Sequence, residues 1–154
     1  MDYENIQKEA LSKLKAFLNE KYSTIDEAMD NWAEFVENSE FMKIEHSLDV
    51  YSIYEDDDDP LIKPVKFYGK KQIKTAWDEH EYRSLLKEKA FIIGFVDFGD
   101  DYILMSTDPN EGIAIIYHDY VYCTDNLDKT VESSQKEMNC SLETLLKLLM
   151  QKNA

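Results

Sequence analysis

The segment 91–119 constrains the fold of this chain most, because it has the pattern of three successive β-strands. Apolar residues fill 91–98, alternate with polar ones over 102–107 and return over 113–117. Two turns rich in turn-forming residues separate the strands, namely Gly99-Asp100-Asp101 and Asp108-Pro109-Asn110-Glu111-Gly112. Short turns join antiparallel neighbours, so the segment predicts an antiparallel meander whose first strand is central and covered on both faces. Because the segment holds no nucleophile motif, phosphate loop or metal cluster, it favours a binding platform over an active site.

Apolar residues at helical spacing predict helices before and after these strands. The predicted helices run over 5–22, from a cap at Ser23-Thr24 to Asn38-Ser39, over 70–89, and from a cap at Asn139 or Ser141 to Met150. Two more extended pieces are expected, over 46–54 with its buried face left open, and over 61–68, where Pro64 favours a sheet edge. We therefore predict a single α+β domain over 1–154. Its mostly antiparallel sheet has helices packed on one face, N-terminal helices and a C-terminal helix.

The charge balance limits the classes of partner that the chain is expected to bind. The 154 residues include 32 acidic and 17 basic ones, a formal net charge of −15. This disfavours nucleic acid and anionic membrane surfaces, which are bound through Lys and Arg, and it favours a basic protein partner. Two cysteines form neither a disulfide framework nor a four-ligand zinc site. The start of the chain lacks a signal-peptide pattern, and no apolar run is long enough to span a bilayer. We expect a cytoplasmic protein without cofactor or metal.

The meander also resembles a known family. The turn Gly99-Asp100-Asp101, the strand from Tyr102 to Asp108 and the element Tyr117-His118-Asp119 are similar to the core of the SUKH superfamily. Its members include bacterial immunity proteins and relatives of a fungal cell-wall-synthesis regulator. The stretch 28–36 keeps the family's aromatic spacing but lacks its Leu-Pro pair. The resemblance implies a protein that binds and neutralises a cognate toxin, often a nuclease, and performs no catalysis itself.

Acidic side chains and one tryptophan are the candidate partner-binding residues. They form an acidic run, part of the helical stretch 70–89 near its possible split at Glu79-His80, and the two turns of the meander: Glu55, Asp56, Asp57, Asp58, Asp59, Trp77, Asp78, Glu79, Asp100, Asp101, Asp108 and Glu111. Several carboxylates in one field attract cations, and a tryptophan can anchor an interface.

Each of these features also has a plainer interpretation. The acidic run can be a solvated loop that protects a sheet edge, turn aspartates are favoured for conformational reasons, and Trp77 can be a core residue. The second turn lacks the remaining ligands of a calcium loop, and neither the histidines nor Cys123 have a visible catalytic partner. A second functional hypothesis is a regulatory protein that binds a small molecule or peptide in a sheet-lined pocket.

Overall fold

A computed structural model describes residues 2–49, 62–79, 90–96, 101–106, 113–117 and 141–152 of the chain. Within these ranges the elements follow in the order α1 (Tyr3–Leu18), α2 (Ile25–Glu37), α3 (Glu40–Lys43), β1 (His46–Asp49), β2 (Ile62–Phe67), α4 (Lys70–Glu79), β3 (Ala90–Val96), β4 (Asp101–Ser106), β5 (Ile113–Tyr117), α8 (Leu142–Leu148) and β6 (Met150–Gln151). The predicted α+β class is confirmed. The sequence also predicts a short extended piece over 120–123 and weak helical character over 125–137, and both lie outside the described residues.

Side-chain caps start the helices where the sequence places them. The Thr24 hydroxyl accepts a hydrogen bond from the Glu27 amide at 3.2 Å, and α2 begins directly afterwards. Ser141 caps α8 in the same way through the Thr144 amide at 3.1 Å. Each cap satisfies one of the amides that the first helical turn leaves without an intrahelical partner. The predicted cap at Ser23-Thr24 and the Ser141 alternative for the last helix are both confirmed.

The strands form one sheet in the order β5-β4-β3-β2-β1-β6, and every paired strand is antiparallel to its neighbour. The predicted meander β3-β4-β5 is confirmed. In β3, Phe91 and Ile92 point to opposite faces and both are buried, as expected for a central strand. A bulge between Ile92 and Gly94 shifts the register against β4. Gly94 suits this position because a Cβ there would lie 2.5 Å from the Lys66 carbonyl oxygen.

The prediction that Pro64 marks an edge strand is wrong, because β2 lies between β1 and β3. Pro64 is opposite Ser47 of β1, and among the described residues the pairs between β2 and β3 run from Val65 to Phe67. The position of Pro64 near the start of β2 therefore does not place this strand at the edge of the sheet.

The chain end also differs from the prediction that Met150 belongs to the apolar helix face. The backbone of Leu149 is extended, so α8 ends at Leu148 and the chain turns into the short strand β6. Met150 pairs with Ser47 of β1, and its side chain is 38% exposed. Helical spacing of leucines could not reveal this change to strand pairing.

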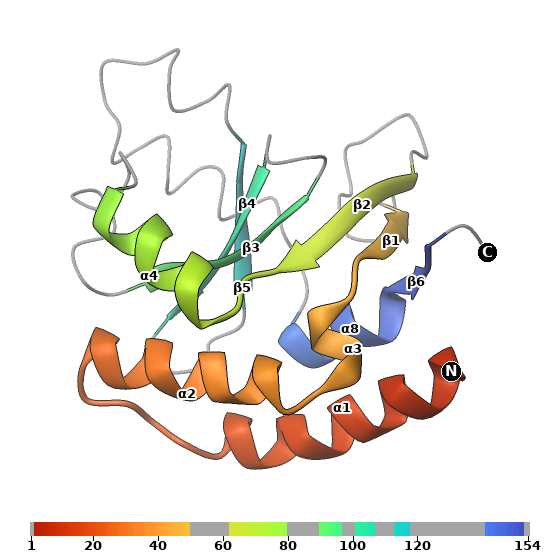
Figure 1. Ribbon diagram of the computed structural model, residues 1–154, viewed down its shortest axis with the longest axis horizontal. Coiled ribbons are helices and arrows are strands. Elements are labelled where there is room, and N and C mark those ends of the chain that lie inside the picture. The colour runs from red at the N-terminus through yellow and green to blue at the C-terminus, as the bar shows by residue number, and fades with distance from the viewer. Residues whose placement is uncertain are drawn as a thin grey trace.

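The core lies between the sheet and the helices. In Figure 1, α1 and α2 form a layer below the sheet, and α3 and α8 lie between that layer and β1. Trp32 of α2 is fully buried, and its ring contacts Phe17, Phe35 and Phe67. The indole N–H also donates to the Tyr68 carbonyl at 3.1 Å. This bond satisfies the polar atom of a buried tryptophan, and it ties α2 to the start of the connection into α4.

Candidate binding surfaces

The outer face of α2 carries a row of four exposed carboxylates, which we call the acidic stripe: Asp26, Asp30, Glu34 and Glu37. Their spacing of four, four and three residues puts all of them on one side of the helix. The opposite side, including Ala28, Met29 and Val36, is buried in the core. The stripe is therefore held on a helix that is fixed to the rest of the protein.

Most of the stripe does not help α2 to fold, although Asp26 lies in the first turn, where a negative charge is favourable. Like charges four residues apart destabilise a helix by a few tenths of a kcal/mol per pair, and acids in the last turn oppose the helix dipole. That turn contains no basic residue. Over the described ranges the stripe has one ion pair, between Asp30 and Lys74 of α4 at 3.3 Å, with both side chains about half exposed. The remaining carboxylates give α2 a concentrated negative field.

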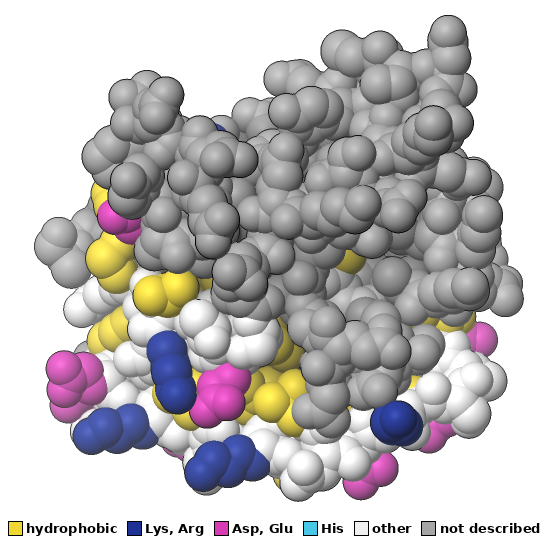
Figure 2. All heavy atoms as spheres, turned by 180° about the vertical axis from the view of Figure 1, so that it is seen from behind, with side chains coloured by type: hydrophobic (Ala, Val, Ile, Leu, Met, Phe, Trp, Pro, Cys, Tyr) yellow, Lys and Arg dark blue, Asp and Glu magenta, His cyan; other side chains and the backbone are white. Residues whose placement is uncertain are grey.

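The stripe was not among the predicted partner-binding residues, although its signal is present in the sequence. As acids in a first helical turn, Asp26 and Glu27 are favourable for the helix itself, which draws attention away from the longer repeat. The repeat of acids at positions i, i+4, i+8 and i+11, in phase opposite to the apolar residues, was sufficient to find it. On α1, by contrast, both signs occur, with Glu9 paired to Lys13 at 2.9 Å. Seen from behind, charged side chains of both signs stand along the lower edge, where the α1 and α2 layer lies (Figure 2).

Most of the predicted partner-binding residues lie outside the described residues: Glu55, Asp56, Asp57, Asp58, Asp59, Asp100, Asp108 and Glu111. The others fall on two elements. Trp77, Asp78 and Glu79 end α4, and Asp101 begins β4 opposite Val96 and Tyr117. Asp78 is exposed.

Trp77 is not the exposed anchor that we predicted. Its side chain is only 7% exposed and belongs to the hydrophobic core. The reason is its position four residues after Ile73, which is also buried, so both side chains project from the inner face of α4. Burying a large indole against that core removes it from the partner-binding surface.

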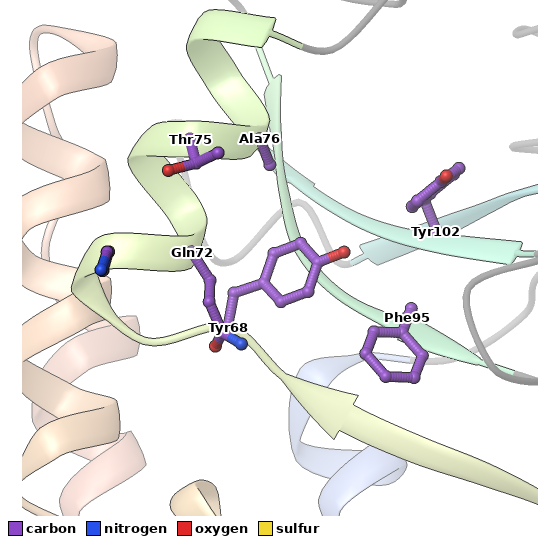
Figure 3. A pocket seen from close by; sticks show the side chains of 7 residues that line it. Tyr68, Gln72, Thr75, Ala76, Phe95 and Tyr102 are labelled. Carbon is purple, nitrogen blue, oxygen red and sulfur yellow. The ribbon is translucent and has the colours of Figure 1, made fainter.

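A groove of about 570 Å³ opens between α4 and the sheet. Its described lining consists of Tyr68, Lys71, Gln72, Thr75, Ala76, Phe95 and Tyr102 (Figure 3). The volume is within the range of small-molecule sites. A groove of this kind is what the second functional hypothesis requires, although the sequence did not indicate which residues form it.

The aromatic side of the groove is set by strand register. Phe95 of β3 is opposite both Lys66 of β2 and Tyr102 of β4, so these three residues share one face of the sheet. Tyr68 follows β2, and its ring lies 6.0 Å from that of Phe95. The Tyr68 amide donates to the Ile93 carbonyl at 2.7 Å. Burial, and secondly the neighbouring Tyr102, raise the pKa of Tyr68, so its hydroxyl stays protonated at neutral pH.

The groove borders the most basic part of the chain. Residues 62–77, which we call the basic segment, contain five lysines and neither Asp nor Glu: Lys63, Lys66, Lys70, Lys71 and Lys74. Lys71 lines the groove directly. A protein with a net charge of −15 thus has a local region of opposite sign.

A buried polar cluster lies away from both surfaces. His46 is fully buried, with Nε2 2.7 Å from the Phe41 carbonyl oxygen and Nδ1 2.8 Å from the Tyr3 hydroxyl. A carbonyl can only accept, so Nε2 carries the proton and Nδ1 accepts from Tyr3. Burial lowers the pKa of His46 to about 4, the Phe41 carbonyl acts in the opposite direction, and the Lys66 charge lowers it further. The neutral imidazole therefore joins α1, α3 and β1, and has no substrate-facing side for acid–base catalysis.

Across the described ranges, no group of three His, Cys, Asp or Glu side chains could hold a metal ion. None of the helices in those ranges combines the length and apolar character needed to cross a membrane. Comparison of the chain with protein-family models, curated proteins and solved structures finds no match.

Proposed function

We propose that this protein is an acidic protein-binding module of the SUKH-like immunity type, which neutralises a toxin by stoichiometric binding to a basic surface. The observation that carries the proposal is the acidic stripe. Four exposed carboxylates occupy one side of α2, and two of them, Glu34 and Glu37, lie in the last turn, where they oppose the helix dipole. A basic partner would relieve the repulsion among these carboxylates. Binding such a partner therefore explains their arrangement better than the stability of the helix does.

The mechanism is electrostatic capture. A concentrated negative field steers a cationic partner toward α2 and raises the association rate in a salt-dependent manner. The core side of α2 is fixed by Trp32 and its aromatic neighbours. The helix backbone that carries the carboxylates is therefore already ordered before the partner binds. The acidic run from Glu55 to Asp59 adds five more negative charges to the chain. Neutralisation then follows from covering the partner's surface, without any covalent chemistry.

Co-expression tests this proposal. A toxin domain encoded beside the gene is expressed with the wild-type chain, with a stripe variant (D26N, D30N, E34Q and E37Q) or with a control variant (E4Q, E9Q, E20Q and E40Q). Both variants lose four negative charges, and all the replaced side chains are exposed. We expect protection by wild type and control but not by the stripe variant, with unchanged or slightly raised thermal stability in the latter. Equal protection by both variants, or the lack of any neighbouring toxin that the chain inhibits, would contradict the proposal.

The groove beside α4 favours a second candidate, a regulatory protein that binds a small molecule or peptide. Its volume of about 570 Å³ and its lining by three aromatic rings from the sheet side support this function. The two candidates use different surfaces. A single protein can therefore have both activities, and each can be tested separately.

A further inference from the structure

The groove combines aromatic rings with positive charge, and this combination indicates the chemistry of its ligand. We propose that it binds a small anionic molecule that contains an aromatic ring. The inference deepens the second candidate function and names its ligand class. It is independent of partner capture by the acidic stripe.

The ring of the ligand would contact the sheet side. Figure 3 shows the Tyr68 ring projecting from the strand end into the space between α4 and the Phe95 and Tyr102 side chains. Each of these three side chains is only partly buried, so apolar ring surface remains available. A planar ring placed against them would gain aromatic contacts in offset or edge-to-face geometry, worth about 1 kcal/mol per pair beyond the burial of area.

The anionic group of the ligand would contact lysines of the basic segment. Lys71 lines the groove, and Lys66 is opposite Phe95 on the same face of the sheet. Among the described lining residues, none has a carboxylate. Lys74 is paired with Asp30 of the stripe, so that acid is already engaged by a lysine of the basic segment. An anion is thus complementary to the groove, and a cation is not.

Polar side chains add directional contacts. Thr75 and Gln72 both line the groove from α4. The Gln72 Oε1 accepts a hydrogen bond from the Gly69 backbone N–H at 3.2 Å. This bond uses the oxygen of the Gln72 side chain, so its NH₂ group is the part that can donate to a ligand. The protonated Tyr68 hydroxyl is a further donor. The groove therefore offers several donors for the oxygens of a carboxylate, sulfonate or phosphate group.

The test uses two fluorescent probes that differ in charge. 1-Anilinonaphthalene-8-sulfonate is an aromatic anion, and N-phenyl-1-naphthylamine is the same ring system without the sulfonate. The whole chain repels anions at long range because of its net charge of −15, so tighter binding of the sulfonate reports local attraction. We expect the sulfonate to bind more tightly than the neutral probe.

Two variants locate the binding. K71Q should raise the Kd of the sulfonate about fivefold, as expected for one partly exposed charge contact, without changing the Kd of the neutral probe. T75W fills the groove from an exposed helix position and should abolish binding of both probes. K15Q and S12W, at exposed positions of α1, are the matched controls and should bind like wild type. Thermal unfolding of each variant verifies that it is folded.

The proposal is overturned if the neutral probe binds as tightly as the sulfonate, if neither binds, or if T75W leaves sulfonate binding intact. Failure of the groove proposal can be distinguished from failure of the proposed immunity function. The stripe variant should bind the sulfonate at least as tightly as wild type, because it loses negative charge, whereas T75W should still protect cells against the toxin.

Discussion

The acidic stripe of α2 and the basic segment of β2 and α4 are neighbours with opposite charge. The stripe has four carboxylates and no lysine on its side of the helix, and residues 62–77 have five lysines and no carboxylate. One ion pair, Asp30 to Lys74, joins them. The net charge of −15 conceals this separation. The comparison teaches that total charge indicates the dominant partner chemistry, whereas the local distribution indicates that a second surface can bind the opposite kind of ligand.

Both regions depend on the same buried frame. The inner face of α2 packs its aromatic residues against β2, and α4 inserts Ile73 and Trp77 into the same core. The charged residues lie on the outer sides of these elements. Changes to the frame should therefore affect both regions together, and changes to the exposed residues should affect one region at a time.

The largest expected effect comes from protonating His46, which would break the frame beneath both regions. Its pKa is about 4 in the folded protein, against an ordinary value of 6.5. Between these values the unfolded chain binds more protons, so stability is complete above pH 6.5 and falls as the pH is lowered to 4. The shift corresponds to a loss of about 3 kcal/mol of unfolding free energy.

Denaturant titrations of wild type and H46Q at pH 7 and pH 4 measure this effect. The carboxylates titrate in both proteins, so the difference between the two isolates His46. We expect the stability advantage of wild type over H46Q to shrink by about 3 kcal/mol at pH 4. A difference that does not vary with pH would show that His46 is not held neutral by the fold.

The next effect sharpens the comparison by straining the shared frame on its groove side, so that the stability beneath both regions falls but the groove is distorted most. In G94A the new Cβ would lie 2.5 Å from the Lys66 carbonyl oxygen and 3.0 Å from the Phe67 Cα, both backbone atoms. Strand β2 would have to move away from β3, at a loss of about 2 kcal/mol of stability. We expect G94A to weaken sulfonate binding in the groove and to leave toxin capture by α2 intact at temperatures where the variant is folded. Unchanged stability in G94A would show that β2 yields without strain.

The smallest effect concerns the link between the two regions. A double-mutant cycle with D30N and K74Q measures the coupling of this exposed ion pair, which we expect to be about 0.5 kcal/mol. The value should fall as salt is added, because surface pairs are screened. A coupling above 2 kcal/mol would mean that the two regions act as one electrostatic unit, against our account of two separate surfaces.

Local patterns were sufficient for much of the fold. The buried faces of α1 and α2, the cap at Thr24 and the meander follow from spacing and turn residues over short stretches of sequence. The central place of β2 could not be predicted from Pro64, because it is set by tertiary pairing with both β1 and β3. The spacing of Ile73 and Trp77 was compatible with burial, but the sequence did not decide between a core residue and an exposed anchor.

The two candidate surfaces differ in the same respect. The acidic stripe is local to one helix, and its spacing can be read from the sequence alone. The groove brings α4 together with Phe95 and Tyr102 from later strands, and only the tertiary fold shows that juxtaposition. The sequence supported a sheet-lined pocket as a hypothesis, but it could not identify Lys71 or Tyr68 as its lining.

The central claim is that the acidic stripe captures a basic partner. Its most direct test is the association rate constant with the toxin domain, measured by stopped flow over a range of ionic strength. For wild type and the E4Q, E9Q, E20Q, E40Q control, we predict fast association that slows steeply as salt is added. For the D26N, D30N, E34Q, E37Q variant, we predict association about tenfold or more slower at low salt, with a flatter salt dependence. Equal rates and equal salt dependence in the two variants would contradict the account.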